Sequence, residues 1–324
     1  MLHTTSKLRF AIRTGGICLA AQLFHPALLA QDLSPIALPS AAAAGVLAQQ
    51  PKGLEKSERH PAYGLQVEYS YVGEGDTSYH GDHGQSDAQT LGVAGQMDYP
   101  LNEHWFIPLS VQSKELWLET LNGLPIPGEI DTLSFGAGVG YHFNDQWTVA
   151  ASVGPTLYRY NDITSDDIGF TTAIHATYQW RPDVLFAFGL AINPDSEVPV
   201  LPLAGARWNI NPDFTLNLMF PRPALIYHLK PQIDLMLVGS GEFATFRTAA
   251  DLGNTIGQIR YNHTLGTYRN FHLGAGAEYR FSNSLSASFE TGYAFGRQID
   301  YKDVGETVTF EPSPYVTAGL RWRF

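Results

Sequence analysis

Polar and apolar residues alternate with a period of two along most of residues 61–324. Successive side chains of a β-strand point to opposite faces, so this pattern predicts strands with one apolar and one polar face. No run of 18 or more apolar residues occurs, so no transmembrane helix is expected. The clearest stretch is residues 132–143, whose apolar face consists of Leu133, Phe135, Ala137, Val139, Tyr141 and Phe143.

Two architectures produce such strands, and they differ in where the apolar face points. A soluble sandwich turns it inward, whereas a membrane barrel turns it towards lipid. Charged residues make up only 16% of the chain, and the polar faces are rich in Gly, Ser and Thr. Aromatic residues gather at predicted strand ends, as in interfacial girdles. These features favour the barrel; the girdle candidates are Tyr99, Trp105, Tyr141, Phe143, Trp147, Tyr178 and Trp180.

Short and long connections also alternate along the chain, which is the rule for periplasmic turns and extracellular loops of such barrels. The longer polar loops are expected at residues 73–87, 113–129, 161–168 and 249–270. The tight turns are expected at residues 100–104, 144–146, 181–183, 211–213, 230–232 and 282–284. They join seven hairpins into 14 strands, or 12 if the proline-interrupted stretch at residues 214–229 is irregular. The predicted fold is all-β: a single transmembrane antiparallel up-and-down β-barrel of 12–14 strands over residues 61–324.

The first 60 residues have a different character. Lys7, Arg9 and Arg13 precede a moderately apolar run and the small-residue sequence that ends at Ala30, which is typical of a cleaved signal peptide over residues 1–30. Export through the Sec pathway to the bacterial outer membrane is expected. Residues 31–60 are rich in Pro, Ser and Ala and predict a flexible periplasmic leader.

Composition narrows the chemistry and the partners. The only cysteine is Cys18, inside the predicted signal peptide, so the mature chain has no disulfide, cysteine-bound zinc or cysteine nucleophile. The net charge of −11 makes nucleic acid an unsuitable partner. Outer-membrane lipids and lipopolysaccharide, the latter bridged by divalent cations to acidic loops, are the expected contacts. A monomer is expected, because trimeric porins generally have larger barrels.

The last eight residues carry the most specific pattern. The pattern of these eight positions is polar, any, Gly, any, any, aromatic, any, aromatic. Its four specified positions are occupied by Thr317, Gly319, Trp322 and Phe324. This resembles the C-terminal assembly signal of bacterial outer-membrane barrels. The resemblance implies that periplasmic chaperones and the barrel-assembly machinery handle the chain during biogenesis.

No enzyme motif is apparent. His175 faces the inferred lumen beside Thr177, and His263 precedes Thr264 in a loop, but neither reproduces a motif of outer-membrane phospholipases, lipid A deacylases or proteases. No catalytic residue and no cofactor are therefore predicted.

A small His/Asp group lies in the first predicted long loop and offers a candidate metal site. His80, Asp82 and His83, with Asp76 and Asp87 nearby, offer ligand types suited to a transition metal or to calcium. Gly and Asp also serve ordinary turn chemistry in a solvated loop. The second interpretation is favoured, so no metal site is predicted.

The inward face carries charges of both signs, which usually pair when buried. Arg207, Glu278, Glu290 and Arg321 are predicted to form a lumenal network that stiffens or narrows the barrel. The alternative is a pore with a charge filter. A barrel of this size can be plugged or conductive, so the sequence leaves both open.

Residues 202–213 and 216–223, and the closing run from Gly292 to Phe324, resemble a family of uncharacterised bacterial outer-membrane barrels. The resemblance implies the same fold over most of residues 60–324 and transfers no functional residue. The leading functional hypothesis is a non-enzymatic pore for small solutes or a structural envelope protein. The alternatives are a lipid-modifying enzyme of the outer leaflet and a surface receptor or adhesin that acts through the long acidic loops.

Overall fold

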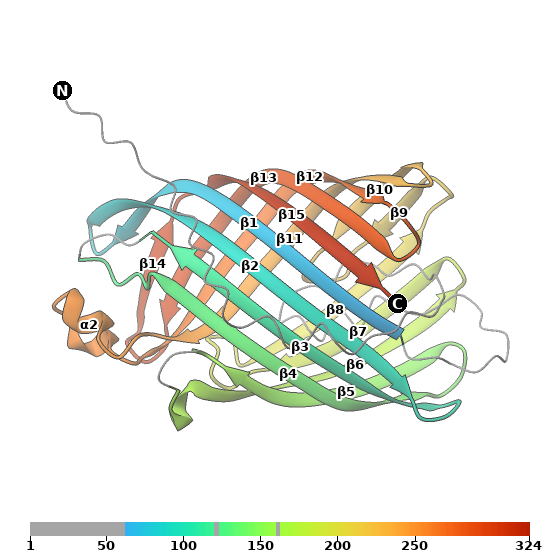
Figure 1. The fold of residues 1–324 in the computed structure, drawn as a ribbon, viewed down its shortest axis with the longest axis horizontal. Coiled ribbons are helices and arrows are strands. Elements are labelled where there is room, and N and C mark those ends of the chain that lie inside the picture. Colours follow the sequence, from blue (N-terminus) through green and yellow to red (C-terminus); the bar gives the residue numbers. More distant parts are fainter. Residues whose placement is uncertain (1–61, 120–122, 160–162) are drawn as a thin grey trace.

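The computed structural model describes residues 62–119, 123–159 and 163–324, so the predicted signal peptide and leader lie outside the described residues. Long antiparallel strands form one closed barrel (Figure 1). The elements are β1 Ala62–Tyr79, β2 Asp82–Pro100, β3 Trp105–Leu118, β4 Glu129–His142, β5 Trp147–Leu157, η2 Ser165–Asp167, β6 Ile168–Arg181, β7 Val184–Ile192, β8 Val200–Asn209, β9 Phe214–Asn217, β10 Ala224–Lys230, β11 Ile233–Arg247, α2 Leu252–Thr255, η3 Ile259–Tyr261, β12 Leu265–Arg280, β13 Leu285–Tyr301, β14 Glu306–Phe310 and β15 Ser313–Arg323.

The wall closes between the two ends of the described chain. Both β14 and β15 pair with β13 on one side and β1 on the other, so they are two parts of one wall strand, interrupted at residues 311–312. The barrel therefore has 14 strands, which confirms the predicted fold class. At the seam, Tyr63 and Phe324 exchange two backbone hydrogen bonds of 3.2 and 3.0 Å.

The apolar faces point outward, as predicted for a membrane barrel. On β12, Leu273 is 63% exposed, whereas the neighbouring His272, which faces the lumen, is 9% exposed. In a closed wall, the backbone N–H and C=O groups of a strand with a paired strand on each side all form hydrogen bonds. A strand in lipid requires this. The chain is a closed antiparallel β-barrel with an apolar outer face, the arrangement of barrels that span a membrane. No helix among the described residues is long and apolar enough to span a membrane.

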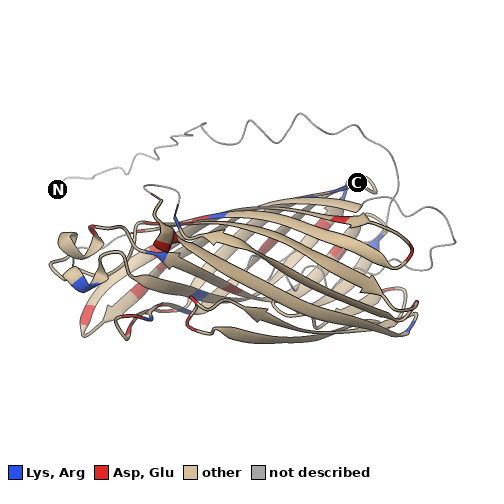
Figure 2. Cartoon of the chain, turned by 90° about the horizontal axis from the view of Figure 1, so that it is seen from below, with Lys and Arg blue, Asp and Glu red and all other residues tan. Residues whose placement is uncertain are grey.

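All six predicted tight turns lie at one end of the barrel, the right-hand end in Figure 1. The barrel rule makes this the periplasmic end. Aromatic pairs line it on the outside: Trp105 packs on Tyr141 and Trp147 on Tyr178, each with ring centroids 4.6 Å apart. Charged positions in Figure 2 are concentrated in the loops and towards the strand ends, with a minority along the strands.

The predicted loop at residues 73–87 is wrong, and those at 113–129 and 249–270 are shorter than predicted, because β3 continues to Leu118 and β12 begins at Leu265. Residues 73–87 do not form a long loop, because β1 and β2 continue as a hairpin to a two-residue turn at His80 and Gly81. Both turn residues have positive φ, 51° and 90°, which matches the right-handed twist of the flanking strands. The extension is held because Thr77 and Tyr79 are buried rather than solvated.

The barrel has two tiers, because one hairpin is much shorter than the rest. β9 has 4 residues and β10 has 7, while β11 has 15. Beyond this hairpin the upper part of β11 contacts β4 on the opposite wall, and Arg247 N donates to Tyr158 O at 3.5 Å. The strand side chains that fill the extracellular half come from β1–β4 and β11–β15.

A continuous apolar cluster, which we call the extracellular core, fills the extracellular tier. Loop residues Leu124 and Ile126 and the η3 residue Tyr261 fold into it. Its members are Val72, Tyr79, Ala88, Leu116, Leu118, Leu124, Ile126, Ile130, Ala244, Phe246, Tyr261, Tyr268, Ala294, Ile299, Tyr301, Val308, Phe310 and Tyr315.

Candidate functional site

Below the extracellular core, buried charges cross the lumen. Lys114 of β3 forms an ion pair with Glu242 of β11, and their side chains are only 1% and 10% exposed. Asn270 supports this pair: its Nδ2 lies 3.5 Å from Glu242 Oε2 and 2.9 Å from His272 Nε2. The pair joins two walls that are not neighbours in the sheet, so it holds the barrel narrow at this level.

The short hairpin supplies a second cross-lumen pair. Residues 218–223 form a bend in which Arg222 N donates to Met219 O at 3.0 Å. The carbonyls of Pro221 and Pro223, on either side of Arg222, accept hydrogen bonds of 2.8 and 2.9 Å from β11. Fixed in this way, Arg222 forms an ion pair with Glu290 of β13. Its guanidinium also lies 3.9 Å from Glu68 of β1.

Further charges line the lumen nearer the two ends. Arg321 Nη1 lies 3.4 Å from Glu278 Oε2 on the periplasmic side. Asp234 contacts both His228, at 2.8 Å, and Arg280. Towards the extracellular core, Arg297 is 2% exposed and donates to Ser86 O at 2.8 Å. Buried charges of this kind stabilise one arrangement of the strands, since separation of any pair leaves a desolvated ion.

The ion pairs of the lumen differ in part from the predicted lumenal network. Glu278 and Arg321 are partners, whereas Glu290 is paired with Arg222, which sequence reasoning did not include. Arg207 lies on β8, opposite Asn217 of β9 in the strand register. A single network of the four predicted residues stays a prediction.

Sequence reasoning also missed Lys114 and Glu242. The sequence pattern predicts a loop from Ser113 onwards, which includes Lys114. In the structure Lys114 lies two residues after Gln112 on β3, and both side chains face the lumen. For Arg222 the available signal was its position between two prolines, which fixes the backbone on both sides. Neither the alternation around Lys114 nor the prolines beside Arg222 indicates which residue is the ion-pair partner, because each partner lies on a strand distant in the sequence.

One part of the inner wall is apolar instead of charged. On β7 the residues facing the lumen are Leu185, Ala187 and Ala191, so this strand is apolar on both faces. Met219 and Phe220 of the bend pack against this surface. The absence of any polar residue in residues 184–192 is the sequence signal for it. We call this surface the inner apolar face; its buried members are Ala173, Leu185, Ala187, Ala191, Leu203 and Met219.

The structure separates the histidines and acids of the first predicted long loop. His80 is bonded to Glu306 rather than grouped with Asp82 and His83. Among the described residues, no three His, Cys, Asp or Glu side chains are arranged to hold a metal ion. His175 is buried on β6, at 5% exposure.

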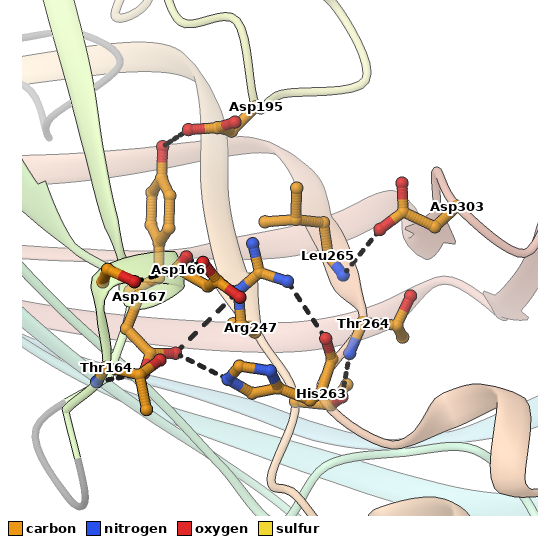
Figure 3. A network of polar contacts seen from close by, with 12 residues as sticks. Thr164, Asp166, Asp167, Asp195, Arg247, His263, Thr264, Leu265 and Asp303 are labelled. Carbon is orange, nitrogen blue, oxygen red and sulfur yellow. Dashed lines mark hydrogen bonds and ion pairs between the residues drawn. The ribbon is translucent and has the colours of Figure 1, made fainter.

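The extracellular loops are tied together by the polar network of Figure 3. Asp167, at 0% exposure, accepts hydrogen bonds of 2.8 Å from both the backbone N and the Oγ1 of Thr164. His263 Nε2 lies 3.3 Å and Arg247 Nε 3.8 Å from the same carboxylate. Nearby, Tyr158 donates to Asp195 at 3.0 Å. One carboxylate therefore links the β5–β6 loop to the segment before β12.

This network is expected to depend on pH. Burial alone would raise the pKa of Asp167, but the hydrogen bonds from Thr164 and the charge of His263 outweigh it and lower that pKa. A lowered folded-state pKa gives stability that is present above the unfolded value of about 3.9 and is lost as pH falls through the folded value.

Hydrogen exchange at the Asp167 amide, bonded to Thr164 O at 3.2 Å, should therefore show protection at pH 7 and release in acid below about pH 4. Exchange rates measured in acid are first corrected for the intrinsic pH dependence of exchange. Asp167→Asn should give the released pattern at pH 7, with the transmembrane strands still protected. Equal protection in the variant and the parent protein would contradict this role of Asp167.

Comparisons with known proteins place the chain in a family. A family model described as a domain of unknown function, DUF6268, matches residues 81–323. No curated protein matches.

Among solved structures, the COG4313 outer membrane channel from Pseudomonas putida F1 matches with 11% identity and a TM-score of 0.45, over 83% of this chain and 97% of that one. The Ralstonia pickettii toluene transporter TbuX matches with 10% identity and a TM-score of 0.43, over 86% and 93%. A Pseudomonas aeruginosa FadL homologue matches with 10% identity and a TM-score of 0.33, over 90% and 95%. Scores this low carry no argument about activity.

Proposed function

The chain belongs to the DUF6268 family, and we propose that it is a non-enzymatic outer-membrane channel for small apolar solutes, closed in the state described above. The observation that carries the proposal is the inner apolar face. An apolar strand face in contact with a water-filled lumen is unfavourable, because apolar surface gains free energy only when it is removed from water. A small apolar solute would supply that surface during passage.

The wall beside this face offers a route. Among the described residues, 200–205 of β8 pair only with β7, and 239–247 of β11 pair only with β12. The other backbone bonds of this part of β11 are two to the prolines of the bend and one to Tyr158. These two strand edges therefore have no ladder partner in the part of the chain that the structure describes. Separation of the wall at these edges breaks few backbone hydrogen bonds, so local opening of the barrel costs the least free energy there.

Side chains cover the route in the closed state. Phe220 of the bend packs towards Phe243 of β11, with ring centroids 6.2 Å apart. The segment between β7 and β8 is held by Asn193, whose Nδ2 lies 3.4 Å from Thr245 Oγ1 of β11. Lys302 also donates to Pro194 O at 2.8 Å. Tyr158 and Thr267 also bind this segment through hydrogen bonds to Asp195 and Glu197. The segment contributes no side chain to the extracellular core, so its movement breaks polar contacts and leaves that core packed.

A structural envelope protein is the second candidate, and the filled extracellular core favours it. The core leaves the axial path closed, so a barrel that never opens would serve only to reinforce the membrane. In this alternative the inner apolar face serves only to seat Met219 and Phe220 of the bend.

Transport can be tested with a defined probe. Whole cells of a porin-deficient Gram-negative host that express the protein should take up radiolabelled toluene faster than vector controls. Proteoliposomes should show no swelling in arabinose, because the lumen is crossed by ion pairs. Arabinose swelling without accelerated toluene uptake would contradict the proposal in favour of an aqueous pore. Absence of both would favour the envelope protein.

The route has its own test. Asn193→Cys with Thr245→Cys, joined by a short bis-methanethiosulfonate cross-linker that forms a disulfide with each thiol, should abolish the gain in toluene uptake. Reduction cleaves both disulfides and should restore the gain. The mature chain has no other cysteine if residues 1–30 are removed, so the linkage is unambiguous. Undiminished uptake in the cross-linked protein would exclude passage beside β8.

The remaining expectations are part of the same proposal. Residues 1–30 direct Sec export and residues 31–60 form a leader. Thr317, Gly319, Trp322 and Phe324 are read by the barrel-assembly machinery, with periplasmic chaperones as earlier partners. The position of Phe324 at the seam with β1 supports this, since the barrel closes through that residue. Phe324→Ala should lower the heat-modifiable fraction in isolated outer membranes, whereas Phe281→Ala, at another exposed periplasmic turn, should not.

A further inference from the structure

A hollow of about 250 Å³ lies on the outer wall of the barrel, away from the lumen. It is formed where β6, β7, β8 and β9 approach their periplasmic ends. The surface around it is apolar except for one cation. Its lining consists of Trp180, Arg181, Val184, Phe186, Ala206, Trp208, Leu216 and Leu218; we call it the outer hollow.

The hollow arises because a small residue is surrounded by large ones. Ala206 of β8 stands opposite Phe186 of β7 in the register, and its carbonyl accepts a 2.7 Å hydrogen bond from Leu218 N. Trp180 and Trp208 are 52% and 41% exposed and form the rim. A side chain larger than Ala at position 206 would fill the space between these rings.

A charge pair stands at the periplasmic edge of the hollow. The Arg181 guanidinium lies 4.6 Å from the Trp180 ring centroid, and its Nη2 lies 3.3 Å from Asp183 Oδ2. Both side chains are about half exposed, at 49% and 42%. Both belong to the β6–β7 turn, which places them at the headgroup level of the periplasmic leaflet.

We propose that the outer hollow is a binding site for one phospholipid of the periplasmic leaflet with a phosphate and an ammonium in its headgroup. Lipid is the molecule that surrounds this face of a barrel, so the occupant is a lipid rather than a solute of the lumen. An acyl chain lies over Ala206 between the aromatic rims. Arg181 binds the phosphate and Asp183 binds the ammonium, which makes phosphatidylethanolamine the matching headgroup.

This inference is independent of the proposed channel, because the hollow faces lipid and shares no residue with the inner apolar face. It gives the barrel a fixed lipid contact beneath the short hairpin. Trp105, an exposed girdle aromatic elsewhere, stands opposite Tyr141 instead of an alanine. It therefore serves as an internal control for nonspecific lipid contact.

The test is native mass spectrometry of the detergent-refolded mature protein, titrated with phosphatidylethanolamine or phosphatidylglycerol. The parent protein should retain one phosphatidylethanolamine at concentrations where further lipids are lost. Ala206→Leu should weaken that binding at least tenfold. Ala204→Leu is the matched control, because Ala204 is an exposed alanine on the same face of β8 outside the hollow, and it should bind as the parent does.

The headgroup is tested separately with Arg181→Gln and Asp183→Asn. Arg181→Gln should weaken both lipids, whereas Asp183→Asn should remove the preference for phosphatidylethanolamine. Equal retention by the parent, Ala206→Leu and Ala204→Leu proteins would overturn the proposal and reduce the hollow to ordinary annular contact. A variant that fails to refold is identified by the loss of heat-modifiable migration, and Trp208→Ala then replaces it, with Trp105→Ala as its control.

Discussion

Lys114→Met is expected to lower the free energy of unfolding by about 3–5 kcal/mol, the usual cost of removing one partner of a buried ion pair. Glu242, 9% exposed, would lose the one cation bonded to it among the described residues. Urea unfolding of the protein refolded into phospholipid vesicles, followed by tryptophan fluorescence, measures the change. The variant should also lose its heat-modifiable band at a lower temperature.

The double variant Lys114→Met/Glu242→Leu is the control. Well-packed apolar side chains often replace a buried ion pair at little cost, so most of the loss should be recovered. A double variant as unstable as the single one would mean that Lys114 acts through packing rather than charge. A single variant within about 1 kcal/mol of the parent would contradict burial of the pair in the folded barrel.

Tyr301→Ala should destabilise the barrel by about 3–5 kcal/mol and leave a cavity in the extracellular core. The Tyr301 side chain is 1% exposed and packs on Tyr261 at a centroid distance of 4.9 Å, while its hydroxyl donates to Pro125 O. Tyr301→Phe keeps the ring and loses only the hydrogen bond, so about 1 kcal/mol is expected. The difference between the two variants isolates the packing contribution.

The same substitution has a functional consequence. Loss of the ring and release of the loop around Pro125 should open the axial path, so planar-bilayer recordings of Tyr301→Ala should show current steps where the parent protein is silent. Tyr301→Phe should stay silent. Stability loss without any current would show that the ion pairs below the core close the lumen by themselves.

The candidate site was less accessible to sequence reasoning than the fold. Alternation identified which face of each strand Glu278, Glu290 and Arg321 occupy, and two of these residues are partners. It did not identify Lys114, Glu242 or Arg222. Partners across a lumen are separated by many strands, and no local pattern specifies the distance between opposite walls.

The sequence by itself determined the strands, the side of each strand that meets lipid, the six tight turns and the closed barrel of up to 14 strands. These follow from the period of the polypeptide backbone and from the requirement that every backbone group in lipid be bonded. Both are local or general constraints, and the alternation of residues 132–143 shows the first of them.

Only the tertiary structure decided that the barrel has two tiers. The shortness of the β9–β10 hairpin allows β11 to reach β4, and this contact decides which inward side chains form a dry core and which cross the lumen as ion pairs. It also extends the β1–β2 hairpin through a region where the sequence predicts a loop. Such outcomes depend on the volume enclosed by all strands together, a quantity that no single segment of the sequence carries.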